Sequence, residues 1–328
     1  ILGETKVFVI AEIGNNHNGS FDLALEMVDA AHDAGADCVK FQMRNMSSVY
    51  RKKSLAKEGE DLGTEYVLDL LERFQLSREE HKKVAEYCKQ KGVLYMCTPW
   101  DSDSVKALES LDVQAYKVAS ADLTNLPLIE VLVATQKPLI LSTGMSSMEE
   151  IQITVDFLNE RKAKFALLHC NSTYPAPLHD INLNLIKRLR EIHPLIGYSG
   201  HERGIAVTLG AVGLGSKIVE RHFTFDRNME GPDHKTSLEP EELKAMVRAI
   251  RNIEKALGSN EKILSPSEEV NINIARKSIV ASCPIRKGEL LSEKNISTKR
   301  PGTGISPMNW DEIIGMVATK DYQTDETI

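Results

Sequence analysis

The feature that most constrains the fold is a repeated alternation of short apolar runs and amphipathic stretches across the first 257 residues or so. The first run is VFVIAEIG (7–14) and the last is KIVERHFT (217–224). The other runs cover residues 38–43, 94–99, 115–120, 138–144, 165–171 and 194–201. Nearly continuous apolar runs, each followed by helical spacing, are typical of parallel strands buried on both faces. Eight such units over about 250 residues predict a (β/α)8 TIM barrel, with an open doubly wound sheet as the competing interpretation.

The pattern changes after the helix-like stretch EPEELKAMVRAIRNIEKALG (239–258). A polar segment follows, and the last fifty residues or so combine a short strand-like run with turns such as RKGE and PGTG. Turn residues between short β-branched runs favour a small, mostly β unit. We therefore predict a barrel domain over 1–264, a linker over 265–277 and a small β domain over 278–328.

Composition excludes some classes of protein. A hydrophobic content of 42% and a charged content of 27% are those of an ordinary globular protein. The formal net charge of −7 argues against nucleic acid as the main partner. No run approaches the roughly 18 apolar residues of a membrane-spanning helix. Five cysteines without a CxxC pair favour reduced thiols, and hence a cytoplasmic location.

Polar side chains gather where the predicted strands end. They include Glu12, Lys40, Gln42, Thr98, Lys117, Ser120, Ser142, Thr143, His169, Ser172, Tyr174, Ser199, His201, Glu220, Arg221 and His222. In a barrel the carboxyl ends of the strands converge on the functional site. Lysines, an arginine and hydroxyls there predict a pocket for an anionic substrate, with Lys40, Lys117 and Arg221 offsetting its charge.

His201 and His222 end two consecutive predicted strands. Adjacent parallel strands lie about 4.8 Å apart, so the two imidazoles are expected to share one divalent ion. With only two evident protein ligands, Mn²⁺ or Mg²⁺ suits such a site better than structural zinc.

Glu12 is a carboxylate on the first predicted strand. Its functional interpretation is an acid or base that faces the reaction centre. The alternative is a structural ion pair with Lys40 or Arg221. GxGxxG, GxxxxGK[ST], HExxH and GxSxG motifs do not occur in the chain.

A series of short motifs resembles the sialic acid synthase family, in the same order and over residues 7–328. They are AEIGNNHNGS, VKFQ, TPWD, YKVAS, LSTGM, YPAP, GYSGH, ERHFT, GPDH and KRPGTG. The resemblance implies a TIM barrel followed by an antifreeze-like (SAF, β-clip) domain. It also implies a metal-dependent enzyme that condenses phosphoenolpyruvate with N-acetylmannosamine and water, giving N-acetylneuraminate and phosphate by C–O cleavage.

The resemblance also implies roles for individual residues. Phosphoenolpyruvate is expected to contact Lys40, Thr98, Lys117, Ser120, Ser199 and Ser172, the last of which stands where some members of the family have Asn. The sugar is expected to contact Gln42, Tyr174, Asp233 and Arg300, together with the segment AKEGEDLGTEY (56–66). Glu12 matches the catalytic acid, and His201 and His222 match the metal ligands, with Lys117 also in the catalytic group. Arg300 is expected to reach the barrel of the other subunit in a domain-swapped homodimer.

Other functions remain open at this point. The nearest is a legionaminic or pseudaminic acid synthase that uses a 2,4-diacetamido-2,4,6-trideoxyhexose, or a synthase that makes a 9-phosphate. A barrel enzyme that makes a deoxy-octulosonate phosphate is more distant, because the antifreeze-like tail argues against it. A non-catalytic carbohydrate-binding protein built on a barrel that has lost its activity is a further alternative. Loss of activity should have removed Lys117, His201 or His222, and all three are present.

Overall fold

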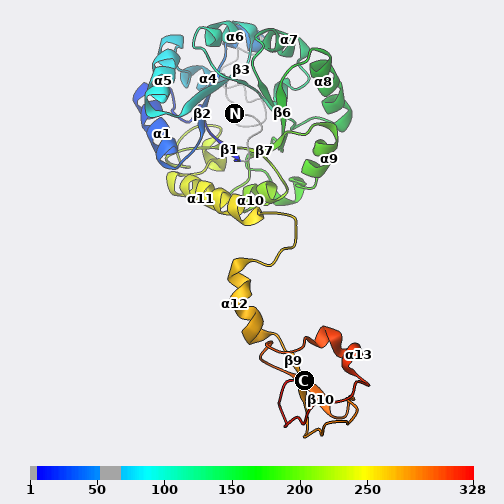
Figure 1. Cartoon of the computed structure of the whole chain (residues 1–328). Helices are drawn as coiled ribbons and strands as arrows, with labels where there is room; N and C mark the ends of the chain where they lie inside the picture. The colour runs from blue at the N-terminus through cyan, green and yellow to red at the C-terminus, as the bar shows by residue number, and fades with distance from the viewer. Residues whose placement is uncertain (1–5, 52–67) are drawn as a thin grey trace. The chain divides into compact units, whose positions relative to one another are not determined.

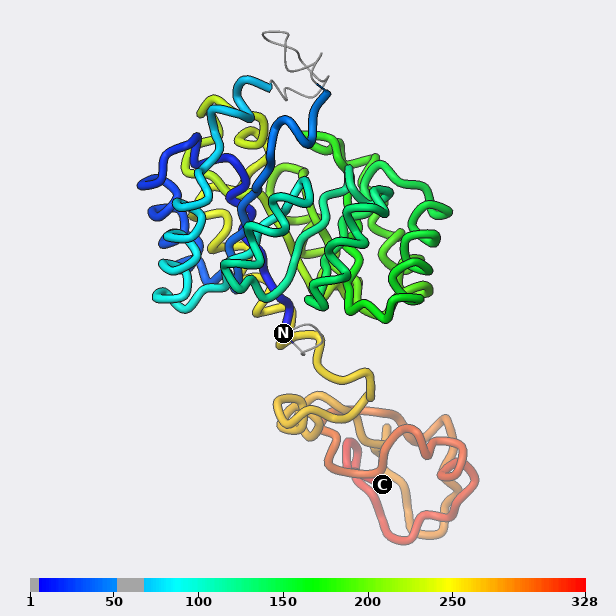
Figure 2. The backbone as a smooth tube through the Cα atoms, turned by 90° about the horizontal axis from the view of Figure 1, so that it is seen from above, coloured from blue at the N-terminus to red at the C-terminus, as the bar shows by residue number. Residues whose placement is uncertain are grey.

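The computed structural model describes residues 6–51 and 68–328, which divide into two compact units at Gly258. In the first unit, helices form an outer ring around the strands, as Figures 1 and 2 show from two directions. The expected segment 56–66 lies outside the described residues, within the gap from 52 to 67.

The first unit contains the eight predicted parallel strands. They are β1 (Phe8–Gly14), β2 (Cys38–Met43), β3 (Leu94–Pro99), β4 (Tyr116–Val118), β5 (Leu139–Ser142), β6 (Phe165–Cys170), β7 (Ile196–Gly200) and β8 (Ile218–His222). Their order is β3-β2-β1-β8-β7-β6-β5-β4, and β3 also packs against β4, so the sheet comes round into a barrel. The predicted (β/α)8 fold is confirmed, and the open sheet is excluded.

Helices connect the strands and cover the outside of the barrel. They are α1 (Phe21–Asp33), α2 (Met46–Val49), α4 (Leu68–Arg73), α5 (Arg78–Lys91), α6 (Ser102–Glu109), α7 (Leu126–Ala134), α8 (Met148–Glu160), α9 (Leu185–Ile192), α10 (Ala206–Gly213) and α11 (Pro240–Leu257), with the short 3-10 turns η1 (Ser120–Asp122), η2 (Leu178–Asp180) and η3 (His234–Thr236). Several starts are fixed by the local sequence. Ser77 and Ser147, for example, each cap a helix whose third residue is a glutamate that returns the hydrogen bond.

Side chains alternate across each strand of the barrel. On β8, Val219 belongs to the large core between the strands and the helices, whereas Ile218 belongs to a small apolar cluster inside the barrel. That inner cluster contains Ile10, Cys38, Met96, Ile140, Ala166, Leu168 and Ile218. It fills the barrel below the level at which the inward-facing side chains become polar. The barrel is therefore a packed core with a polar cavity at the carboxyl ends of its strands.

The second unit has its own core. Its strands β9 (Ser278–Ala281) and β10 (Ile296–Lys299) are antiparallel, with Ile296 opposite Ala281. Its other elements are α12 (Pro266–Ala275), η4 (Pro307–Asn309) and α13 (Trp310–Ile313). The buried apolar residues of the unit are Ile279, Ala281, Ile285, Leu291, Ile296, Ile313, Ala318 and Tyr322. The prediction of a small, mostly β second unit is confirmed.

The predicted linker over 265–277 contains the helix α12. Ser265 and Glu268 form a capping box and Pro266 stands at the first helical position, where its missing N–H costs nothing. We predicted a linker here because the composition is polar, although the sequence contains these helix-start signals. Among the described residues of both units, no helix combines the length and the apolar character needed to cross a membrane.

Candidate active site

A cavity of about 250 Å³ opens at the carboxyl ends of the barrel strands. It is lined by Glu12, Lys40, Gln42, Arg44, Tyr50, Thr98, Trp100, Lys117, Ala119, Ser120, Ala121, Ser142, Met145, Cys170, Ser172, Tyr174, Ser199, His201, Glu220 and His222. Eleven of the thirteen residues to which the family resemblance gave a role line this one cavity; Asp233 does not, and Arg300 belongs to the second unit.

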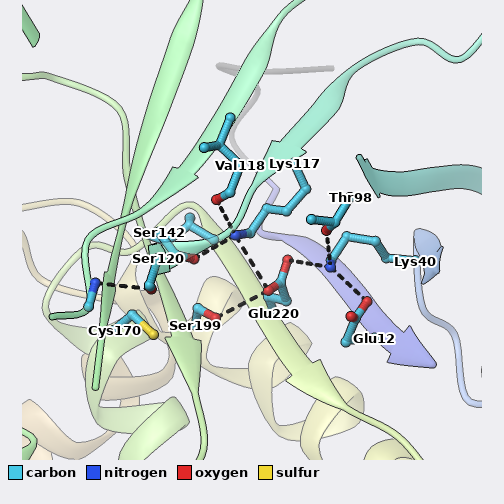
Figure 3. Close-up of polar contacts among 12 residues, drawn as sticks. Glu12, Lys40, Thr98, Lys117, Val118, Ser120, Ser142, Cys170, Ser199 and Glu220 are labelled. Carbon is cyan, nitrogen blue, oxygen red and sulfur yellow. Dashed lines mark hydrogen bonds and ion pairs between the residues drawn. The ribbon is translucent and has the colours of Figure 1, made fainter. Parts of the chain in front are cut away.

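Two buried lysines and two buried carboxylates form the floor of the cavity (Figure 3). Lys40 Nζ lies 2.8 Å from Glu12 Oε2 and donates to Thr98 Oγ1 at 2.8 Å. Lys117 Nζ donates to Ser142 Oγ at 2.6 Å and to the Val118 carbonyl at 2.8 Å. Glu220 lies between the two ammonium groups, 3.9 Å from Lys40 Nζ and 3.8 Å from Lys117 Nζ.

The two carboxylates have opposite pKa shifts. Burial raises the pKa of Glu12 to about 7, although Lys40 acts against the shift. Burial also acts to raise the pKa of Glu220, but Lys117 and Lys40 outweigh it, and the net pKa is lowered. Near neutral pH, Glu12 therefore exchanges a proton readily, whereas Glu220 stays ionised. Two carboxyl groups whose pKa values are driven apart are a common arrangement for an acid and a base in one site.

The imidazoles of His201 and His222 lie side by side in the wall of the cavity, with ring centroids 5.3 Å apart and the ring planes tilted by 45°. Tyr174 stacks on the His201 ring at 4.1 Å and meets the His222 ring edge-on at 5.9 Å. His201 Nδ1 lies 2.6 Å from the Asn171 carbonyl, which fixes that ring and leaves Nε2 as the nitrogen for a ligand.

This pair of rings fits the expected divalent ion. His222 Nδ1 is buried without a hydrogen-bond partner, and burial, with the nearby His201, keeps the pKa of His222 well below its usual range. Its neutral form therefore offers a lone pair. Burial lowers the pKa of His201, but Cys170 and the Asn171 carbonyl outweigh it and raise the net pKa, so a metal ion and a proton compete for this ring. Among the described residues no group of three or more His, Cys, Asp or Glu side chains is placed to hold a metal.

Hydroxyl groups and a glycine line the side of the cavity near β5 and β6. Ser120 Oγ accepts from the Gly144 N–H at 3.1 Å. A Cβ at Gly144 would lie 2.2 Å from Ser172 Oγ and 2.8 Å from Ser120 Oγ, so only glycine lets the loop after β5 approach these hydroxyls. Ser199 Oγ donates to Glu220 Oε1 at 3.2 Å. The hydroxyls thus stand beside the lysines, where anion oxygens would bind.

Arg221 does not face the cavity, contrary to our expectation. Because side chains alternate along β8, Glu220 and His222 point inward and Arg221 points outward, where it is fully buried against Glu202 at 2.9 Å. It therefore cannot offset the charge of a substrate or pair with Glu12.

Two predicted sugar contacts are not among the lining residues of the cavity. Asp233 is buried, with Oδ2 4.0 Å from His222 Nδ1. Arg300 belongs to the second unit, where its Nε donates to the Ala275 carbonyl at 2.7 Å. Gln42 does line the cavity and donates from Nε2 to Glu12 Oε1 at 3.0 Å.

Sequence reasoning gave no role to several residues that line the cavity, among them Glu220, Arg44 and Trp100. Glu220 is the central carboxylate, and its position two residues before His222 on one strand was the available signal. Arg44 donates to Gln42 Oε1, and its guanidinium lies 4.9 Å from the centroid of the Trp100 ring. Both of these follow strand ends, Arg44 after β2 and Trp100 after β3, so their places in the sequence also indicated the site.

Comparison with known proteins gives a consistent result over the whole chain. A family model described as the NeuB family matches residues 27–262, and a SAF domain model matches residues 276–328. The N,N'-diacetyllegionaminic acid synthase of Campylobacter jejuni is 43% identical, covering 98% of this chain and 99% of that protein. The enzyme of the same name from Legionella pneumophila is 38% identical, covering 98% and 93%. A solved N-acetylneuraminic acid synthetase from Leptospira borgpetersenii, in complex with citrate, is 35% identical with a TM-score of 0.75, covering 83% and 92%.

Proposed function

The chain belongs to the NeuB family and carries a SAF domain, and on this premise we propose that it makes a legionaminic-type sugar acid. It is a phosphoenolpyruvate-condensing synthase, and the proposed acceptor is a 2,4-diacetamido-2,4,6-trideoxyhexose. N-acetylmannosamine, our first expectation from the sequence, becomes the second candidate. The two legionaminic acid synthases, at 43% and 38% identity, support this order.

One observation carries the assignment to this cavity. Two buried lysines flank a carboxylate that stays ionised, within a wall of hydroxyls. Phosphoenolpyruvate carries nearly three negative charges, and ammonium groups with hydroxyl donors match its phosphate and carboxylate oxygens. Lys40 and Thr98 would hold one part of it, and Lys117 with Ser120, Ser172 and Ser199 the other.

The two carboxylates would divide the proton transfers. Carbon 3 of phosphoenolpyruvate bonds to the aldehyde carbon of the open-chain sugar, and the aldehyde oxygen takes up a proton, which Glu12 is suited to supply. Water then adds at carbon 2 and loses a proton, for which the ionised Glu220 is the base. The bond from carbon 2 to the phosphate oxygen breaks, the hydroxyl at carbon 2 becomes the ketone and gives its proton to the phosphate, and inorganic phosphate leaves.

The divalent ion would be held by His201 and His222. When bound, it supplies Lewis-acid polarisation of the aldehyde carbonyl, a contribution of several kcal/mol in metal-dependent enzymes. The chain's own part is to fix both rings, through the Asn171 carbonyl on one side and the stacked Tyr174 on the other. We propose Mn²⁺ or Mg²⁺, because two imidazoles leave most positions to oxygen ligands.

The charges on the cavity wall favour a neutral acceptor over a sugar phosphate. Among the described lining residues, Lys40, Lys117 and Arg44 are positive. Glu12 and Glu220 offset part of that charge, and phosphoenolpyruvate would use the rest. A second phosphate would find no further lysine or arginine on this part of the wall, and the proposed divalent ion would be engaged by the aldehyde. This argument ranks the synthase of a 9-phosphate below the proposed function.

The test of the proposed function is a panel of acceptors. We expect kcat/KM for 2,4-diacetamido-2,4,6-trideoxymannose to exceed that for N-acetylmannosamine by about 10-fold. A hydrogen bond contributes about 0.5–1.5 kcal/mol, and about 1.4 kcal/mol corresponds to tenfold. N-acetylmannosamine 6-phosphate should be the poorest substrate. Phosphate release with Mn²⁺ gives the rates, and mass spectrometry identifies the products. A preference for the 6-phosphate would contradict the proposal, and so would the absence of phosphate release with every acceptor.

Arg300 supports a further proposal, that the second unit of one chain completes the cavity of another in a homodimer. We expect Arg300→Ala to raise KM for the acceptor about 10-fold and to change KM for phosphoenolpyruvate less than about 2-fold, because a charged hydrogen bond is worth about 1.5–3 kcal/mol. Arg286→Ala, at another arginine of the same unit, is the matched control. An acceptor KM equal to that of the parent would count against the role of Arg300.

We also propose a cytoplasmic location. All five cysteines are free in the structure, four of them buried and Cys283 exposed. Free thiols are the usual state in a reducing compartment.

A further inference from the structure

A buried ion pair lies directly behind the two imidazoles, outside the cavity. Arg221 Nη1 donates to Glu202 Oε1 at 2.9 Å, and both side chains are 0% exposed. In the chain, Glu202 directly follows His201 and Arg221 directly precedes His222. The ion pair therefore joins the neighbours of the two proposed metal ligands.

The guanidinium of Arg221 does more than neutralise one carboxylate. It donates to two main-chain carbonyls of the segment after β7, those of Glu202 and Gly204, the second at 2.8 Å. It also donates to Thr208 Oγ1 on α10 at 2.8 Å. Tyr198 OH donates to Glu202 Oε2 at 2.7 Å, which holds the carboxylate from the side of β7. The end of β8 is thus tied to both the backbone and the side chain that follow His201.

Gly200 gives independent evidence that this arrangement is tightly fitted. Gly200 on β7 is the register partner of Arg221 on β8. A Cβ at Gly200 would lie 2.6 Å from Glu202 Oε2 and 3.0 Å from Arg221 Cδ. The carboxylate and the arginine stem therefore pack directly on the strand backbone, and the position one residue before His201 has no room for a side chain.

The energetics of burial make the pair rigid. Two charges removed from water cost several kcal/mol each, and their mutual contact and hydrogen bonds offset that cost. Both Nη groups of Arg221 donate hydrogen bonds, whereas its Nε has no partner among the described residues. Any shift that separates Arg221 from Glu202 leaves an unpaired buried charge. The ends of β7 and β8 therefore have little freedom to move relative to each other.

We propose that Arg221 and Glu202 are positioning residues that hold the imidazoles of His201 and His222 at the spacing needed to share one divalent ion. This inference rests on the metal site in the proposed function. A purely structural ion pair would affect only stability, whereas a positioning pair also sets metal affinity. Groups that hydrogen-bond directly to metal-ligating side chains contribute about 10- to 100-fold to affinity. We expect an effect in the same range from a pair that acts through the backbone beside the ligands.

The test is Arg221→Lys, which keeps the charge but loses the fork that reaches several acceptors at once. We expect the Kd for Mn²⁺, measured by electron paramagnetic resonance without substrates, to rise about 10- to 100-fold. The Kd for phosphoenolpyruvate, measured by calorimetry without metal, should change less than about 2-fold. Thermal unfolding reports the loss of stability separately.

Arg251→Lys is the matched control. Arg251 Nη2 pairs with Asp37 Oδ2 at 2.8 Å and its Nη1 donates to the Val7 carbonyl at 2.7 Å, just before β1 begins, far along the strand from the cavity. It joins a carboxylate and a backbone carbonyl as Arg221 does. Its substitution should lower Tm yet leave the Kd for Mn²⁺ within about 2-fold of the parent.

The outcomes separate the inference from its premise. A folded Arg221→Lys that binds Mn²⁺ as tightly as the parent overturns the inference. If that variant does not fold, Tyr198→Phe is used in its place, because it removes only the hydroxyl that holds Glu202. We expect Tyr198→Phe to raise the Kd for Mn²⁺ at least about 3-fold. An unchanged Kd for Mn²⁺ in Tyr198→Phe overturns the inference. If His222→Ala binds Mn²⁺ as tightly as the parent, the metal site of the proposed function is itself wrong.

Discussion

His222→Ala should lower kcat about 1,000-fold or more at saturating Mn²⁺ and both substrates. The substitution removes one of two proposed metal ligands and, with it, the polarisation of the aldehyde. A loss of about 4 kcal/mol in transition-state stabilisation corresponds to roughly three powers of ten. Phosphate release under single-turnover conditions gives the rate of the chemical step.

The control for this substitution is His193→Ala. His193 stacks on Phe165 at 4.0 Å, at the opposite end of β6 from the cavity. The substitution His193→Ala removes the same imidazole ring and should keep kcat within about 2-fold of the parent. Activity in His222→Ala close to that of the parent, with added chelator making no difference, would remove the metal from the account.

Lys117→Met should lower kcat/KM for phosphoenolpyruvate about 100- to 1,000-fold. The two side chains are similar in length, but methionine brings no charge to the anion and leaves Glu220 with one lysine, Lys40, in place of two. Losing one member of a buried charged pair costs about 3–5 kcal/mol, part of which appears in substrate binding. Steady-state kinetics with phosphoenolpyruvate as the varied substrate measures the effect.

Lys137→Met is the matched control for Lys117→Met. Lys137 lies on the outside of the barrel, where it pairs with Glu109 at 2.8 Å. Its substitution should leave kcat/KM within about 2-fold of the parent, since surface ion pairs contribute little. Similar losses in the two variants would mean that Lys117 acts through stability and not through the substrate.

Much of the site was predictable from the chain because a barrel brings the carboxyl ends of all its strands together. Lys40, Lys117, His201 and His222 each stand at such an end, so their convergence followed once the eight strands were recognised. The same reasoning could have separated Glu220 and His222 from Arg221. Period-two alternation puts neighbours on opposite faces, and the apolar Ile218 inside the barrel fixes which face is which.

Other features depend on contacts that no local pattern encodes. The opposite pKa shifts of Glu12 and Glu220 arise from the burial of both groups and from their distances to lysines on other strands, and these depend on the register of the sheet. The place of Asp233 behind His222 depends on how the chain folds back after β8. The helix α12 was not predicted, because none of its residues is buried and its sequence therefore lacks the periodic apolar pattern of a packed helix.

The most direct test of the central claim follows one oxygen atom. The protein, phosphoenolpyruvate, Mn²⁺ and 2,4-diacetamido-2,4,6-trideoxymannose are combined in water enriched in ¹⁸O, and the phosphate is read by ³¹P nuclear magnetic resonance. Condensation in this cavity with attack of water on carbon 2 predicts a sugar acid together with phosphate that carries no heavy oxygen. Heavy oxygen in the released phosphate would mean that water attacks phosphorus, and the roles given to Glu12 and Glu220 would then be wrong.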